Sequence, residues 1–199
     1  MFRFLRKVAS RINRLAGLSI QRTYLYRISR PDGWSSTAGN DKSISWELLS
    51  PERIGQLLDI GPFDVSDGLK QLQRGDRCYT VSVDGHLAHY SWVQRSGSHP
   101  ITEAGLSVPV ASGEFWIYSC RTVECARGKG IYPATLQRIV NDHFEEGYRT
   151  AWIYTSRENI ASQKGILRAG FGRVATLGAF RVGRHYYSMG RPNTGNNSL

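Results

Sequence analysis

Apolar positions recur with two different periods along the chain, and these periods predict the order of its strands and helices. Short runs rich in β-branched and aromatic residues predict strands, whereas apolar spacings of three and four predict helices. Cys78–Val83 and His86–Val93 form the clearest pair of strands, because Asp84-Gly85 between them is a strong signal for a hairpin turn. The same criteria predict further strands at Thr23–Ser29, Ile44–Leu49, Glu114–Val123, Thr150–Thr155, Gly172–Phe180 and Arg184–Met189.

Helices are predicted in the longer intervals between these strands. Ser50 caps the first helix, and Pro51 stands in its first turn, where the missing N–H costs nothing. Further helices are expected at Ser66–Arg74, Ile131–Glu146 and Glu158–Ala169. Gln94–Gly113 is rich in Gly and Pro and is expected to be a loop-like insertion. This order predicts a mixed α/β sheet, antiparallel at first and parallel around the strand–helix–strand unit.

The first 18 residues have the pattern of a basic amphipathic helix, and no acidic residue precedes Asp32. Three interpretations stay open: a helix packed on its own domain or on a second subunit, a helix on an anionic membrane surface, and an organellar transit peptide. We divide the chain into a basic arm and linker (1–43), a main domain (44–191) and a flexible tail (192–199).

Composition narrows the class of protein. A chain of 199 residues suits one domain, and no apolar run reaches the ~18 residues of a membrane span. The net charge of +10 suits an anionic binding partner, which would be nucleic acid, a membrane surface, or a cofactor and substrate. No recognised nucleic-acid motif is present. Three cysteines without a C-x-x-C pair argue against disulfides or zinc and favour a reducing cytosol. Cys125 is interpreted as structural rather than as a catalytic thiol.

The segment Val123–Ile131 links a predicted strand to a predicted helix and carries the strongest chemical signal. Backbone N–H groups at a helix N-terminus lack intrahelical partners, and the helix dipole favours anions there. Gly128 and Gly130 allow a ligand to approach the backbone, and Arg127 and Lys129 add positive charge. Together these features predict a cradle for a pyrophosphate.

Residues 114–171 resemble the acetyl-CoA-binding half of the Gcn5-related N-acetyltransferase (GNAT) superfamily. Its loop pattern, Q/R-x-x-G-x-G/A, is met by Arg127 and Gly130, whereas its sixth position is Tyr132, followed by Pro133. We expect the ring of Tyr132 to lean aside, toward the pantetheine or the adenine. The resemblance extends over residues 44–190 in strand order but over 114–171 alone in motifs.

A second match begins at Asn159 and is similar to the helix start N-x-x-A/S of the same family. Ala169-Gly170-Phe171 follows, as does the Gly-Phe strand start in relatives. The resemblance implies that the Asn159 side chain bonds the pantetheine arm and that Ser162 supports it. The alternative role for Asn159 is an ordinary helix cap.

The resemblance also implies a fold and a mode of binding. The fold is a mixed, mostly antiparallel sheet with helices on both faces, whose central parallel pair, 114–123 and 150–155, splays apart at the cofactor site. Backbone groups near Thr122 and Val123 would pair with the pantetheine amides, and residues 127–132 would hold the pyrophosphate. Acetyl-CoA is the implied acyl donor, and no metal is implied.

Acyl transfer to an amine needs a base, an oxyanion donor and a proton for the departing thiolate. Glu114 is the first candidate for the base, and the N–H near Val123 is the candidate oxyanion donor. His86 and His89 are further candidates for the base, but their spacing of three places them on opposite faces of a strand. Glu103 would contact the acceptor if the insertion forms a lid.

The proton donor is not fixed by the motifs. Many relatives have a Tyr seven residues after the Asn, whereas this chain has Ile166. Tyr132, Tyr154 or Tyr186 would serve instead, or the proton of the acceptor would reach the sulfur directly.

The sequence therefore predicts a cytoplasmic N-acyltransferase that uses acetyl-CoA and a small-molecule or peptide amine. A nucleotide-linked amino sugar, a peptide N-terminus, a lysine side chain and a small amine are open acceptors, and a longer acyl donor is not excluded. The alternative is a catalytically degenerate coenzyme A-binding module held at a membrane or nucleic acid by residues 1–18. A homodimer and contact with the inner surface of the membrane are open as well.

Overall fold

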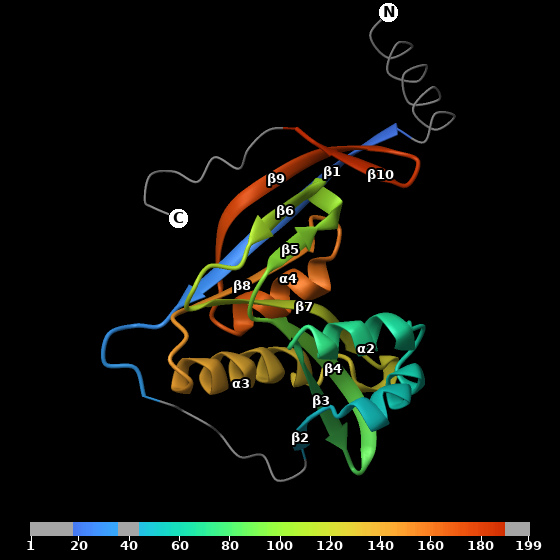
Figure 1. Cartoon of the computed structure of the whole chain (residues 1–199), viewed down its shortest axis with the longest axis vertical. Coiled ribbons are helices and arrows are strands. Elements are labelled where there is room, and N and C mark those ends of the chain that lie inside the picture. The colour runs from blue at the N-terminus through green and yellow to red at the C-terminus, as the bar shows by residue number, and fades with distance from the viewer. Residues whose placement is uncertain (1–17, 36–43, 190–199) are drawn as a thin grey trace, which may run out of the picture.

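An eight-stranded mixed sheet forms the centre of the protein (Figure 1). The computed structural model describes residues 18–35 and 44–189, and the strand order is β10-β9-β1-β8-β7-β4-β3-β2. Neighbouring strands are antiparallel except β7 and β8, which are parallel. The strands are β1 (Leu18–Ser29), β2 (Ile44–Leu48), β3 (Arg77–Val83), β4 (His86–Gln94), β7 (Glu114–Thr122), β8 (Thr150–Ser156), β9 (Gly172–Val182) and β10 (His185–Ser188).

Helices cover both faces of the sheet. On one face, α3 and α4 bury Leu136 and Ile166 against Phe115 and Ile117 of β7. On the other face, η1 and α2 pack around Trp92 of β4. The helices are η1 (Pro51–Asp59, a 3-10 helix), α2 (Val65–Gln73), α3 (Ile131–Glu145) and α4 (Ile160–Arg168). The predicted fold class, a mixed and mostly antiparallel sheet between helices, is confirmed.

The alternation of side chains along β7 divides the core into these two layers. Phe115 and Ile117 face α3, whereas Trp116 points to the opposite face and stacks on Trp152 of β8, with ring centroids 5.7 Å apart. Burying each such large apolar side chain contributes about 1.5–3 kcal/mol. The start of β7 and β8 is therefore fixed from both sides.

β1 is longer than predicted and lies inside the sheet. The expected strand Thr23–Ser29 is present, but it begins at Leu18 and inserts between β9 and β8. Its first residues pair with the end of β9, where Ile20 lies opposite Phe180, and both of these side chains are exposed. Without a buried face, they give no alternating signal in the sequence. The sheet thus includes part of the segment assigned to the arm, whose helix lies outside the described residues.

The insertion Gln94–Gly113 is ordered, which corrects the expectation of a loop. It contains β5 (Ser98–Ile101), η2 (Thr102–Ala104) and β6 (Leu106–Pro109), and β5 and β6 form a separate two-stranded sheet. Ile101 and Ala104 are fully buried against Trp116 and Trp152. Strands this short that contain proline give little periodic signal. The hairpin covers one face of the central sheet beside α2 (Figure 1).

No helix in residues 18–35 and 44–189 is both long and apolar enough to span a membrane.

His143 of α3 makes the stability of this core dependent on pH. Its buried ring stacks on Phe115 at a centroid distance of 4.3 Å, and its Nδ1 donates to the Ile139 carbonyl at 2.8 Å. Burial lowers the pKa of His143 from 6.5 to about 4. Between these values, the unfolded chain binds more protons than the folded one. The free energy of unfolding therefore falls as pH falls below about 6.5.

Replacing His143 with Phe should remove the part of the fall in unfolding free energy at low pH that comes from His143. The phenylalanine ring keeps the ring contacts but has no group that titrates. We expect His143→Phe to reduce the drop in unfolding free energy between about pH 7.5 and pH 5 by about 2 kcal/mol. Denaturant unfolding at the two pH values measures this difference. His86→Phe, at an exposed position, is the control. An unchanged pH dependence in His143→Phe would contradict the account.

Candidate functional site

β7 and β8 begin as a paired parallel ladder and then part. Their pairing joins Glu114–Trp116 to Thr150–Trp152, and the remaining described residues of the two strands are not paired with each other. Ser119 has a positive φ of 48°, and the register places Ser119 and Cys120 opposite the single residue Ser91 of β4. This β-bulge bends β7. Backbone groups on the edge of β7 that faces β8 therefore need other partners.

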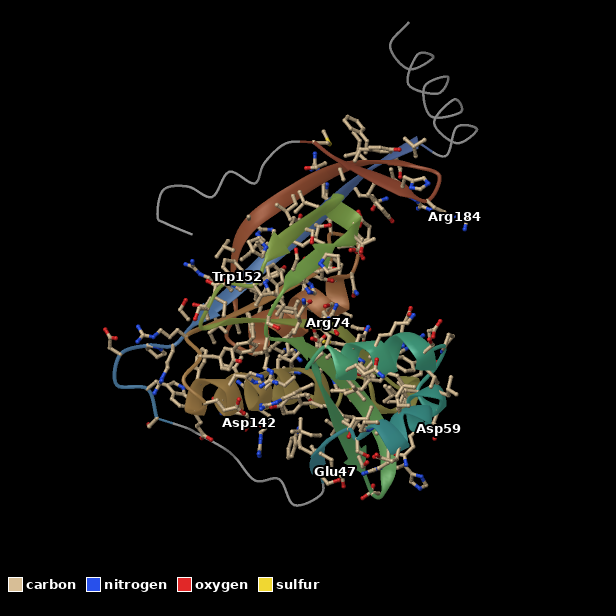
Figure 2. All side chains as sticks on the ribbon, in the orientation of Figure 1. Glu47, Asp59, Arg74, Asp142, Trp152 and Arg184 are labelled. Carbon is tan, nitrogen blue, oxygen red and sulfur yellow. The ribbon has the colours of Figure 1, made fainter. Side chains whose placement is uncertain are left out.

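Two cavities open along this splay and share part of their lining. The larger, of 770 Å³, lies among α2, the β5–β6 hairpin and the ends of β7 and β8. The smaller, of 580 Å³, lies between the loop at residues 126–133 and α4. Four residues line both cavities: Cys120, Tyr132, Asn159 and Ser162. Figure 2 shows Arg74, which lines the larger cavity, between α2 and the hairpin.

The smaller cavity is bordered by a run of unpaired N–H groups. Among the described residues, no hydrogen-bond acceptor meets the backbone N–H of Gly128, Lys129, Gly130, Ile131 or Tyr132. Gly128 and Gly130 have φ of 77° and 79°, and a Cβ on either would meet nothing within 4 Å. The space before this backbone is open, and the N-terminus of α3 adds positive potential. This arrangement suits a pyrophosphate.

Several cations of the described residues lie around this loop. Arg127 lines the smaller cavity, and its Nε donates to the Thr122 carbonyl at 3.3 Å. Lys129 is exposed beside it. Lys164 and Arg168 of α4 line the opposite wall, which sequence reasoning missed. Their spacing of four on the last predicted helix was the signal that would have found them, since it places both on one helix face.

The N–H of Val123 is not available as an oxyanion donor, which corrects that prediction. It donates to the Ala88 carbonyl of the neighbouring chain segment at 2.9 Å. Because backbone groups alternate in direction along a strand, those of Thr122 point to the opposite edge, toward the splay. The N–H of Thr122, but not that of Val123, can therefore pair with a ligand there, while the Thr122 carbonyl already accepts from Arg127 Nε.

Tyr132 leans aside as expected, but onto α4. A Cβ on Gly165 would lie only 2.4 Å from the ring, so this glycine is what admits Tyr132. The hydroxyl lies 3.3 Å from the Ser162 Oγ, and the ring centroid lies 5.8 Å from that of His89. Burial raises the pKa of Tyr132 well above its ordinary value. A protonated phenol therefore stands in the wall that the two cavities share.

Asn159 performs the capping role and still faces both cavities. Its Oδ1 accepts a hydrogen bond from the Ser162 N–H at 3.0 Å, which caps α4. No partner within the described residues meets its Nδ2 amide group. The cap and a contact with a ligand are therefore compatible.

His89 is fully buried and does not line either cavity. Its Nδ1 lies 2.7 Å from the Thr122 Oγ1, and its Nε2 lies 2.8 Å from the Ser91 Oγ. Burial lowers the pKa of His89 to about 3. The ring is neutral at physiological pH and holds the bulged part of β7 against β4. The structure places the alternative, His86, at an exposed position.

Glu114 lies away from the region where β7 and β8 part, whereas Tyr154 lies within that region. Glu114 lies at the paired end of β7, where it accepts a hydrogen bond from Trp152 Nε1 at 2.9 Å, and it lines neither cavity. Tyr154 lines the larger cavity. Burial raises its pKa, and the adjacent Glu103 carboxylate raises it further. Glu103 lines the same cavity, so the insertion does contribute a wall to it.

Cys120 is a lining residue that sequence reasoning missed. A regular period of two would place it with Tyr118, but the bulge at Ser119 moves it to the face of Ile117. A non-glycine residue with positive φ leaves no signal in the sequence. Burial raises the pKa of Cys120 to about 12, so the thiol is not a nucleophilic thiolate at neutral pH.

Cys125 is exposed in η3 (Glu124–Ala126) and lines neither cavity. Across residues 18–35 and 44–189, no group of three or more His, Cys, Asp or Glu side chains is placed to hold a metal ion.

The contact between Gly165 and Tyr132 is testable by a double-mutant cycle. Gly165→Ala should cost about 1–3 kcal/mol of unfolding free energy, because the new methyl overpacks the Tyr132 ring. In the Tyr132→Ala background, the same change should cost little. Gly55→Ala, where a Cβ meets nothing within 4 Å, is the control. Equal costs for Gly165→Ala in both backgrounds would refute the contact.

No protein-family model and no curated protein matches this sequence. Solved structures do match. An acetyltransferase from the GNAT family of Novosphingobium aromaticivorans aligns with a TM-score of 0.56 and 14% identity, over 81% of this chain and 64% of its own. A GCN5-related N-acetyltransferase from Sphaerobacter thermophilus aligns with a TM-score of 0.58 and 16% identity, over 84% and 53%. The ribosomal-protein-S18-alanine N-acetyltransferase from Escherichia coli aligns with a TM-score of 0.52 and 12% identity, over 65% and 77%.

These identities are low, so the likeness concerns the fold. The chain spans less than two thirds of the length of the first two structures. The likeness concerns a fold that, in this chain, consists of an eight-stranded sheet with a parallel β7–β8 pair. The chain therefore has the fold of the GNAT acetyltransferases, and its structural neighbours include members of that family.

Proposed function

We propose that this chain is an acyl-CoA-dependent N-acyltransferase that transfers acetyl from acetyl-CoA to an amine. The observation that carries the proposal is the adjacency of two cavities of different chemistry. A cavity bordered by unpaired N–H groups shares four lining residues with a second cavity that has charged and polar residues in its walls. A donor with a long arm and an anionic end fits the first, and an acceptor fits the second.

The residues present fit acetyl-CoA. The N–H groups of 128–132 and the cations Arg127, Lys164 and Arg168 suit its phosphates. The amide of Asn159 and the backbone of Thr122 suit the polar groups of its arm. When bound, acetyl-CoA supplies an activated thioester carbonyl. The chain supplies orientation, the exclusion of water and the handling of protons.

Direct attack by the acceptor fits this site better than an acyl-cysteine route. The cysteine that lines both cavities, Cys120, keeps its proton because burial raises its pKa to about 12. The position of the usual family tyrosine, Ile166, is fully buried in the core and supplies no proton. Ser162 lies one helical turn before Ile166 on α4, and the protonated hydroxyl of Tyr132 from α3 lies beside it. Tyr132 is our candidate proton donor to the departing sulfur.

The alternative is a coenzyme A-binding module without catalysis, and Ile166 is the observation that favours it. Release of free thiol from acetyl-CoA in the presence of amines separates the two functions.

We also propose that the protein is cytoplasmic and that residues 1–18 contact anionic lipid.

Gly130 provides the experiment that tests donor binding. Gly130→Val fills the open space before the loop, so it should weaken acetyl-CoA binding at least about tenfold, or about 1.4 kcal/mol. Gly113→Val is a matched control, because Gly113 has the same φ of 79° and equally open surroundings but lines neither cavity. Both variants bear similar backbone strain.

The measurement is the shift of the thermal unfolding midpoint with acetyl-CoA. Ligand at about 100 times its Kd stabilises the folded state by about 2.7 kcal/mol. Wild type and Gly113→Val should show the full shift, and Gly130→Val a much smaller one. No shift in wild type, or equal shifts in both variants, would overturn the proposal.

A further inference from the structure

Hydrogen-bond acceptors without partners gather on the residues that wall the larger cavity. Gln71 of α2, His99 of β5 and Glu103 of η2 all line it. The Gln71 Oε1, the His99 Nε2 and the Glu103 Oε2 are buried, and none has a hydrogen-bond partner among the described residues. Leaving a buried polar atom unpaired costs about 1–3 kcal/mol each. A ligand would remove that cost if its binding brought N–H or O–H donors to these atoms, which are shielded from solvent in the free protein.

The network around His99 fixes its Nε2 as an acceptor. Gln94 Nε2 donates to the carbonyls of Ser96 and Ser98 at 2.8 and 3.1 Å, so its Oε1 is the atom that faces His99. The His99 Nδ1 donates to this oxygen at 2.8 Å and therefore carries the ring proton. Burial, with the nearby Arg74 charge, lowers the pKa of His99 to about 4. The neutral ring thus presents a lone pair at Nε2.

Charge adds a second, independent constraint. Four charged side chains line the larger cavity: Asp67, Lys70, Arg74 and Glu103. Lys70 pairs with Asp67 at 3.0 Å, and Arg74 pairs with the buried Asp76. Among the described residues that line the cavity, Glu103 is the one charged side chain without an ion-pair partner. The wall therefore carries one unpaired negative charge, which suits a ligand with one positive charge rather than several.

We infer that the acceptor is a small, polyhydroxylated primary amine with a single positive charge, which is the chemistry of an amino sugar. This inference rests on the proposed function. Glu103 binds the ammonium group of the acceptor, while Gln71 and His99 accept hydrogen bonds from the hydroxyls of the acceptor. A polyamine would bring several positive charges to a wall that also holds Lys70 and Arg74.

Glu103 also acts as the base. Its carboxylate accepts one proton from the ammonium group, and the neutral nitrogen attacks the thioester carbon. The new C–N bond forms, the C–S bond breaks, Tyr132 protonates the released sulfur, and the second nitrogen proton restores the Tyr132 hydroxyl. The products are the N-acetylated amine and free coenzyme A thiol. Tyr154 lines the same wall as Glu103, and its hydroxyl donates to the Pro100 carbonyl of the hairpin at 3.4 Å.

The test uses the full chain, with D-glucosamine as the probe and with spermidine and a lysine peptide for comparison. Thiol release from acetyl-CoA gives kcat and KM, and calorimetry gives the binding of each amine. We expect glucosamine to have the highest kcat/KM of the three. Glu103→Gln should lower kcat about 100-fold and weaken glucosamine binding, because a base contributes about 10²–10⁴ in rate. It should leave stabilisation by acetyl-CoA unchanged.

Two kinds of variant complete the design. Glu145→Gln changes an exposed carboxylate of α3 that lines neither cavity, and it should behave as wild type. Gln71→Leu and His99→Phe each remove one acceptor, so they should raise KM for glucosamine about tenfold with little change in kcat. Thermal unfolding of each variant verifies its fold, and the comparison of amines on wild type needs no variant.

The outcomes separate the two proposals. If acetyl-CoA binds but spermidine or the lysine peptide is preferred, or if Glu103→Gln keeps wild-type kinetics, the inference is wrong and the proposed function stands. If wild type neither binds acetyl-CoA nor releases thiol with any amine, the proposed function itself fails.

Discussion

The separation of β7 from β8 beyond Trp116 and Trp152 is the constraint on which the site depends. Paired strands satisfy their own backbone groups, whereas parting strands leave N–H and C=O groups that need another partner. Stacked tryptophans lock the closed end, and the bulge at Ser119 opens the other. Buried His89 of β4 holds the bulged strand through Thr122, while Ser91 of its own strand contacts its other ring nitrogen. The opening is therefore built into the sheet.

Each end of this opening has a different chemistry. On one side, the loop before α3 presents N–H donors and cations, which suit an anionic group. On the other side, α2 and the β5–β6 hairpin present acceptors and one uncompensated carboxylate, which suit a cation with further donors. Tyr132, admitted by Gly165, stands between them with a protonated hydroxyl. In the proposed function, the donor and the acceptor would thus use separate walls of two adjoining cavities.

Local patterns were enough to name most of the residues that the structure gathers around the smaller cavity, because their signals are local. Arg127, Gly128 and Gly130 lie within one short loop, and Asn159 and Ser162 within one helical turn, so spacing alone relates them. The acceptor side could not be predicted in this way. Glu103 and His99 belong to a hairpin whose short, proline-containing strands lack periodicity, and only burial of Ile101 and Ala104 fixes it on the sheet. The bulge that exposes Cys120 to both cavities, and the pairing that occupies Val123, depend on contacts between distant strands.

Amide hydrogen exchange tests the central claim most directly, because the claim concerns particular backbone N–H groups. The amides of residues 128–132 and of Thr122 should exchange fast in the free protein and become protected when acetyl-CoA is added. The Val123 amide, bonded to Ala88, should be slow in both states. Protection that appears elsewhere on the surface, or loop amides whose exchange acetyl-CoA leaves unchanged, would contradict the account.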